Sequence, residues 1–165
     1  MSATDIRFTL PMVPLGKGRG RAVLSGGFMR PTVRVVTPTR TRSWEEDFGL
    51  QAQQYRPEAL LVGPVRVDVL AVLARPAKLP KRWSPVGLCW APVRPDADNI
   101  RKAVLDALSE WWKDDGQVVA GDTLKVYAER GRPPRITVRI RAGAALPLLP
   151  ELLAGGLGLL EAPPC

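Results

Sequence analysis

The chain has 165 residues, enough for one domain with a core of its own. It carries 24 Lys and Arg against 16 Asp and Glu, a formal net charge of +8, which favours phosphate backbones over an anionic membrane face or a merely basic surface. Histidine is absent, which excludes Ser-His-Asp and Cys-His nucleophiles, histidine general bases and zinc sites built on histidine.

Hydrolysis by this chain would therefore need carboxylates or a metal-bound water. The two cysteines, Cys89 and Cys165, lack metal-ligand spacing, which argues against a zinc site or a disulfide framework. The sequence has no signal-peptide pattern at its start and no apolar run of membrane-spanning length. We therefore expect a cytoplasmic protein with reduced thiols and no membrane partner.

Alternating residues predict a first strand at 6–10. The segment 14–21 then places Lys17, Arg19 and Arg21 at every second position, with glycines between them. Glycine lets a backbone approach a ligand closely, and the cations can reach phosphates, so this segment is either a direct DNA contact or a flexible basic hairpin arm. It is not a Walker loop, because Gly-Lys is not followed by Ser or Thr, so no nucleotide cofactor is expected.

The next part of the chain predicts a returning strand at 32–36 and a helix at about 44–55, with Thr41 or Ser43 as its N-cap. The acids expected in the first turn of this helix have a structural role, complementing the helix dipole. They are Glu45, Glu46 and Asp47. The β-branched and apolar run 65–73 predicts a central strand, buried on both faces toward its end.

The segment 76–95 holds five prolines among basic residues. Because proline interrupts both helices and strand ladders, this segment is predicted to be a loop. Two tryptophans of this loop, Trp83 and Trp90, either stack on unpaired bases or pin the loop to the core. Its candidate DNA contacts are Lys81, Arg82 and Arg94.

The clearest helical pattern covers residues 99–112, where apolar residues recur at three- and four-residue steps and form one face. Asp98, Lys102 and Asp106 lie four apart on the opposite stripe. Arg101 of the same helix is a further candidate DNA contact.

Strands are expected at 118–129 and 135–141, with a Gly-Arg-Pro-Pro turn between them. The elements together predict an α/β (α+β) fold, in which a small mixed β-sheet packs against two main helices in one domain, residues 1–141. Residues 142–165, rich in Ala, Leu, Gly and Pro, are expected to form a short helix or a flexible tail without assigned chemistry.

Carboxylates stand at both ends of the 99–112 helix. Asp96 and Asp98 would lie about 200° apart on a regular helix, but Pro95 holds the chain extended there, so both side chains can turn to one side. In one interpretation Asp98 is an N-cap and the later Asp114-Asp115-Gly is a turn. In the other, Asp115 folds back beside Asp96 and Asp98, and three carboxylates with waters and a phosphate oxygen hold Mg²⁺.

Two runs, residues 94–108 and 113–119, resemble the signature of RusA-type Holliday junction resolvases, the crossover junction endodeoxyribonucleases of bacteria and their phages. The resemblance spans roughly residues 6–141 and is most specific between 96 and 119. It implies a small homodimeric domain that binds four-way DNA junctions and nicks paired strands with Mg²⁺, for which Mn²⁺ substitutes. A bacterial or phage protein associated with the nucleoid is therefore expected.

Carried over by position, the resemblance implies that Asp96, Asp98 and Asp115 are catalytic aspartates and metal ligands. It implies that Lys102 is the functionally important lysine one helical turn on. The alternative for Lys102 is a simple ion pair with its neighbours along the helix, worth a few tenths of a kcal/mol.

The expected function is that of a magnesium-dependent, structure-specific endodeoxyribonuclease that resolves four-way junctions in recombination and repair. One alternative is a non-catalytic DNA-binding protein, in which the carboxylates are caps and turns and the basic residues bind the phosphate backbone. The other alternative is a related nuclease that acts on forks or flaps.

Overall fold

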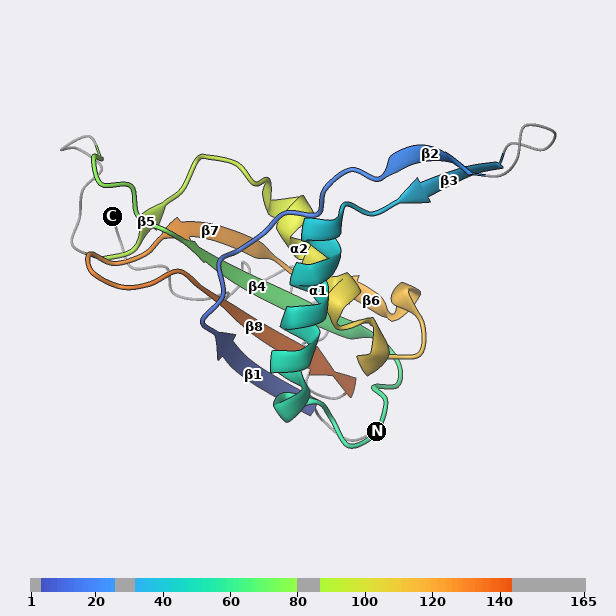
Figure 1. The fold of residues 1–165 in the computed structure, drawn as a ribbon. Coiled ribbons are helices and arrows are strands. Elements are labelled where there is room, and N and C mark those ends of the chain that lie inside the picture. The colour runs from blue at the N-terminus through green and yellow to red at the C-terminus, as the bar shows by residue number, and fades with distance from the viewer. Residues whose placement is uncertain (1–3, 26–31, 80–86, 144–165) are drawn as a thin grey trace.

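The structure, a computed structural model, describes residues 4–25, 32–79 and 87–143. Within these ranges one mixed β-sheet has the two main helices on one of its faces, and a separate hairpin extends away from it (Figure 1). This confirms the predicted fold class. None of the described helices is long and apolar enough to cross a bilayer. The division at residue 142 stays a prediction, since residues 144–165 lie outside the described ranges.

The sheet is built around β4 (Val65–Leu73), whose β-branched and apolar residues are buried at all but one position. The strand order is β1-β8-β4-β7-β5, and β6 also pairs with β4. β4 is antiparallel to β8 and parallel to β6 and β7. The predicted central strand is therefore confirmed. The remaining strands of the sheet are β1 (Thr4–Leu10), β5 (Cys89–Trp90), β6 (Val118–Ala120), β7 (Thr123–Tyr127) and β8 (Arg135–Ala142).

The single strand predicted at 118–129 is wrong, because the chain breaks between β6 and β7. Gly121 has a φ of +146° there, and an added Cβ would lie 1.8 Å from the carbonyl oxygen of Val67. A second correction concerns the proline-rich loop, where Cys89 and Trp90 do form a short ladder with β7. Cys89 is buried and free, and Trp90 is exposed.

The first helix, α1 (Thr39–Ala52), begins five residues earlier than predicted and continues into the 3₁₀ turn η1 (Gln53–Tyr55). Its N-cap is Pro38, with φ −56° and ψ 138°, and no side chain caps it. The predicted caps are therefore wrong: Thr41 is buried inside the helix, and its hydroxyl accepts a hydrogen bond from the Gly18 amide. Because of the earlier start, the first turn holds no acid, and the dipole role assigned to Glu45 and its neighbours is wrong as well.

The second helix, α2 (Ala97–Ala107), has Asp96 rather than Asp98 as its N-cap. Its apolar face is buried as predicted, at Ile100 and other positions. The helix ends earlier than predicted, because Leu108 leaves the α region, and the chain continues in the 3₁₀ turn η3 (Ser109–Trp111).

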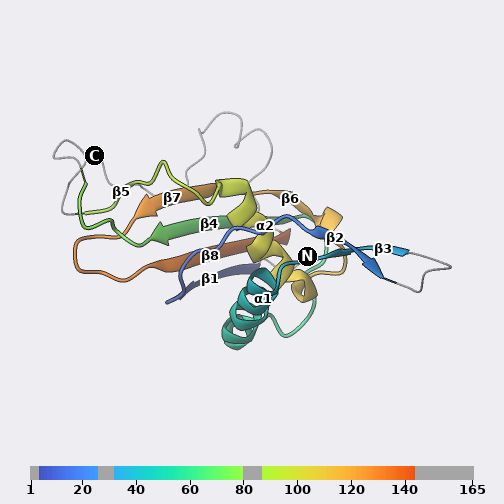
Figure 2. The same ribbon diagram turned by 45° about the horizontal axis from the view of Figure 1, so that its top comes forward.

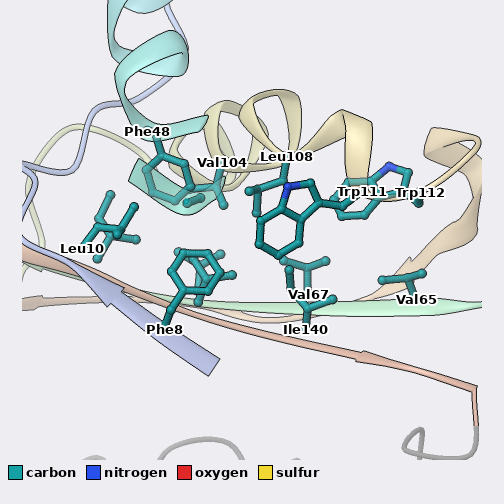
Figure 3. Packing of buried hydrophobic residues seen from close by; sticks show 14 of the residues in the cluster. Phe8, Leu10, Phe48, Val65, Val67, Val104, Leu108, Trp111, Trp112 and Ile140 are labelled. Carbon is teal, nitrogen blue, oxygen red and sulfur yellow. The ribbon is translucent and has the colours of Figure 1, made fainter. Parts of the chain in front are cut away.

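Aromatic side chains pack α1 and the turn η3 onto the sheet. Phe8 of β1 lies 6.3 Å from Phe48 of α1 and 5.8 Å from Trp111, measured between ring centroids (Figure 3). The two helices also approach each other closely, since a Cβ added to Gly49 would lie 3.1 Å from the carbonyl oxygen of Ala107. Both helices begin at the same end of the molecule (Figure 1).

The hairpin consists of β2 (Arg21–Ser25) and β3 (Thr32–Val36), paired antiparallel. It confirms the predicted returning strand and forms a sheet separate from the main one. Both views show the two strands projecting from the body (Figures 1 and 2).

Buried charges on β4 form an ion network. Arg66 and Asp68 are 3% and 2% exposed, and the Arg66 guanidinium contacts both Asp68 and Asp122, the latter at 2.6 Å. Arg141 of β8 donates to Asp68 at 2.9 Å, and the Asp122 amide donates to Asp68 at 3.0 Å. Asp68 therefore compensates two guanidinium groups and one backbone donor.

We expect Asp68→Ala to lower the free energy of unfolding by about 3 kcal/mol, because a buried guanidinium loses a compensating charge. The matched control is Asp5→Ala, which removes the solvent-exposed partner of Arg139 and should cost less than about 1 kcal/mol. Urea unfolding followed by tryptophan fluorescence measures both. Equal losses for the two variants would contradict a structural role for the buried network.

Candidate functional site

A basic groove lies where the two main helices begin. It has a volume of about 650 Å³ and opens to solvent. The charged and polar side chains that line it are Lys17, Arg19, Arg40, Arg94, Asp96 and Asn99. Three of these cations, and Asp96, were predicted as functional residues from the sequence, and the fold brings them together.

The basic segment reaches the groove by passing tightly between the starts of α1 and α2. The Lys17 amide donates to the carbonyl of Asn99 at 2.9 Å, and the Gly18 amide donates to the Thr41 hydroxyl at 3.2 Å. A Cβ added to Gly16 would lie 2.6 Å from the Cβ of Pro95. Glycine is thus needed at position 16 for packing against the protein itself, whereas the sequence suggested close approach to a ligand.

The Lys17 side chain joins the two helices. Its ammonium lies 3.4 Å from Glu45 of α1 and contacts the carboxylate of Asp106 of α2. The side chain is only 23% exposed. Lys17 therefore has a structural partner on each helix, and its predicted DNA contact stays a prediction.

The other three cations of the groove, Arg19, Arg40 and Arg94, are exposed to solvent. Arg40 was not predicted as a site residue. The signal for it was the Thr-Pro-Thr-Arg-Thr run at 37–41, which places this arginine in the first turn once α1 is seen to begin at Thr39.

The acidic residues at the start of α2 are also exposed. Asp96 has extended backbone angles, φ −71° and ψ 151°, as predicted from Pro95, and its carboxylate makes no capping hydrogen bond. Asp98 follows in the first turn, and Lys102 lies exposed one turn later. Lys125 fixes the chain just before the helix by donating to the carbonyl of Pro95 at 2.8 Å.

Asp115 lies in a different, well-bonded turn. The 3₁₀ turn η4 (Asp115–Gln117) is capped by Asp114, which accepts from the Gly116 amide and shares a capping box with Gln117. The carboxylate of Asp115 accepts a hydrogen bond from the indole of Trp112 at 3.2 Å. Gln117 also donates to the carbonyl oxygens of Leu61 and Gly63, which ties the turn to the loop before β4.

The register of β4 separates this turn from the groove. Val118, three residues after Asp115, lies opposite Val65, whereas Lys125, which holds Pro95, lies opposite Ala71. Among the described residues no three acidic or cysteine side chains are grouped so that they could hold a metal ion. Asp96, Asp98 and Asp115 therefore form no such group within the described part of one chain, and their joint role as metal ligands stays a prediction.

Arg101 faces the sheet. Its guanidinium donates to the carbonyl oxygens of Val67 and Ala120 at 3.3 and 3.0 Å, where the ladder passes from β6 to β7. Burial lowers the pKa of Arg101, which remains charged at neutral pH. These bonds hold the first turns of α2 against β4, and the predicted DNA contact of Arg101 stays a prediction.

The remaining predicted contacts are only partly described. Lys81, Arg82 and Trp83 lie outside the described residues. Arg21 is described in its backbone, at the first position of β2, directly after the groove.

Two comparisons with known proteins cover this site. A sequence model of the family described as "Endodeoxyribonuclease RusA" matches residues 11–141, which include the groove, both helices and the turn of Asp115. The chain is also 34% identical over 146 residues to the uncharacterized protein YqaN of Bacillus subtilis (strain 168). That alignment covers 85% of this chain and 98% of YqaN.

We expect Gly16→Ala to destabilise the protein by about 1–3 kcal/mol, because the new methyl group would overlap Pro95 at the floor of the groove. Gly87→Ala is the matched control, since nothing lies within 4 Å of a Cβ added there. Thermal and urea unfolding of both variants measure the effect. If Gly16→Ala unfolds like the control, the segment is less tightly held than these distances require.

Proposed function

Since this chain belongs to the RusA endodeoxyribonuclease family, we propose that it cleaves four-way DNA junctions by paired nicking. The family consists of endodeoxyribonucleases, and Holliday junction resolution is the activity that it implies. The single observation on which the proposal rests is the groove, which three exposed arginines line together with Asp96. Roles in recombination and repair, near the nucleoid of a bacterium or phage-infected cell, follow from this proposal.

The groove suits a phosphate backbone. Arg19, Arg40 and Arg94 present guanidinium groups that bind phosphate oxygens without reading the base sequence. α1 and α2 both begin at this groove, and the first amides of a helix have no partner within it. Those amides and the helix dipoles add to the attraction for phosphate.

Asp96 sets the groove apart from a simple phosphate-binding surface. A carboxylate beside a phosphodiester is electrostatically unfavourable unless a cation lies between them. Nucleases of this family are generally metal-dependent, and we propose that the ion is Mg²⁺, with Mn²⁺ as a substitute. This charge balance favours a nuclease over a protein that only binds DNA.

The described residues of one chain do not fit a complete magnesium site with three carboxylates. Asp96 and Asp98 are the proposed ligands near the groove, and Mg²⁺ often takes its other ligands from waters and substrate phosphates. Asp115 is not grouped with them among the described residues of one chain. Asp115 would therefore serve the same ion only from the second protomer of the proposed homodimer.

The residues of this chain also act on the substrate directly. The groove arginines orient the phosphodiester, and Lys102, exposed one turn after Asp98, offsets charge that develops on the scissile phosphate. A homodimer with two-fold symmetry presents two such grooves to one junction, so that opposing strands are cut in pairs.

We expect Asp96→Asn to reduce magnesium-dependent cleavage of a synthetic four-way junction by at least about 100-fold, because a catalytic metal contributes several kcal/mol. Junction binding without metal should stay the same or tighten, since a negative charge leaves a phosphate groove. Asp47→Asn is the control, because it neutralises an exposed carboxylate of α1 that does not line the groove.

Unchanged cleavage by Asp96→Asn would remove Asp96 from the mechanism. If the unmodified protein binds junctions but cuts nothing, the non-catalytic alternative holds. Cleavage rates on a four-way junction, a fork and a linear duplex decide between a junction resolvase and a nuclease of forks or flaps.

We expect Arg40→Ala to weaken binding to all DNA sequences alike and to reduce the slope of log K against log salt concentration by about one. The reason is that one phosphate contact releases about one counterion. Arg7→Ala removes an exposed cation of β1 that is not among the groove-lining residues, and it should leave the slope unchanged. Fluorescence anisotropy at several salt concentrations measures both.

A further inference from the structure

The hairpin rises directly out of the basic groove. Arg19 precedes β2 by two residues, and Arg40 follows β3 by four, so both strands start or end beside groove cations. Figures 1 and 2 show the hairpin projecting from the end of the molecule where α1 and α2 begin. Any DNA backbone bound in the groove is therefore placed against the base of this hairpin.

One face of the hairpin is apolar and exposed. Val33 and Val35 are 67% and 75% exposed, and their i, i+2 spacing puts them on the same face of β3. Ala22, the partner of Val35 in β2, is exposed as well. Val23 and Val36 are about half exposed and lie on the opposite face of the hairpin. A two-stranded ribbon is marginally stable alone in water, and a continuous apolar patch usually marks a binding surface.

The position of the apolar hairpin face beside the groove favours one kind of DNA ligand over others. A regular duplex bound in the groove would meet it with charged backbone or with stacked base pairs, neither of which offers a flat apolar surface. At a branch point whose arms are not stacked on one another, the last base pair of each arm has no stacking neighbour and exposes an apolar face. Apolar side chains that contact such faces are a known way of stabilising unstacked DNA.

We infer that the β2–β3 hairpin is a wedge that contacts unstacked base pairs at the branch point, with Val33 and Val35 as its contact residues. The inference rests on the proposed function, since it takes branched DNA as the ligand. It assigns preference for branched over linear DNA to the hairpin, whereas the groove arginines bind either form through phosphates.

The test compares the unmodified protein with the double variant Val33→Thr/Val35→Thr. Threonine keeps the β-branch and the strand preference, so the hairpin retains its shape while each valine exchanges a methyl group for a hydroxyl. Val62→Thr is the matched control, because Val62 is 73% exposed but belongs to the loop before β4.

The first measurement is made in EDTA, so that it does not depend on cleavage. A four-way junction carries 2-aminopurine at the branch point, and its fluorescence rises when the base unstacks. We expect a rise with the unmodified protein and with Val62→Thr, and the loss of most of that rise with the double variant. The junction dissociation constant of the double variant should increase by about tenfold, while that for linear duplex changes less than about twofold.

The second measurement is cleavage in Mg²⁺. The double variant should cut the fully paired junction slowly and recover on a junction whose central bases are mismatched, since the branch point is then already open. If it opens and cuts the paired junction like the unmodified protein, or if no protein raises the fluorescence, the inference is overturned. If the double variant elutes from a sizing column as a smaller species than the unmodified protein, the face packs against a second copy, which also overturns it.

The unmodified protein could raise the fluorescence through Val33 and Val35 and still cut no DNA in Mg²⁺. That result would support the wedge and contradict the proposed nuclease activity. The two proposals therefore fail by different measurements.

Discussion

The contact of the Lys17 ammonium with Glu45 of α1 and Asp106 of α2 is the interaction on which the proposed site depends. An exposed ion pair contributes little to stability, but this one is partly buried and is backed by amide hydrogen bonds from Lys17 and Gly18. Together these contacts hold one segment between two helix starts. This segment carries Arg19 and leads into the hairpin. Packing of the segment, and not charge alone, therefore positions the cations of the groove.

Two groups of basic residues among those described have different roles. Lys17, Arg66, Arg101 and Lys125 have partners inside the fold, which join helices to the sheet and close the break between β6 and β7. Arg19, Arg40 and Arg94 remain available in the groove. The formal charge of +8 therefore indicates the kind of partner, while the three groove arginines indicate where that partner binds.

Sequence reasoning was most successful where local pattern and burial agree. The apolar run of β4 and the periodic face of α2 were both identified, because burial of those residues is what forms the elements. It was least successful at boundaries. The start of α1 was placed five residues too late, because Thr41 has the side chain of a cap but is used to bind Gly18 across the fold. Gly121 divides one predicted strand into two because the backbone of Val67 approaches it.

The sequence by itself determined the family, the α+β class and the identity of the acidic and basic residues, because these depend on residue type and on spacing along the chain. Only the tertiary structure decided which of them meet. Asp96 lines the groove together with three arginines, while Asp115 accepts a hydrogen bond from Trp112 in a separate turn. The physical reason is that Lys125 of β7 fixes the start of α2 and Gln117 fixes the turn of Asp115, and spacing along a chain does not contain the pairing of β6 and β7 with β4.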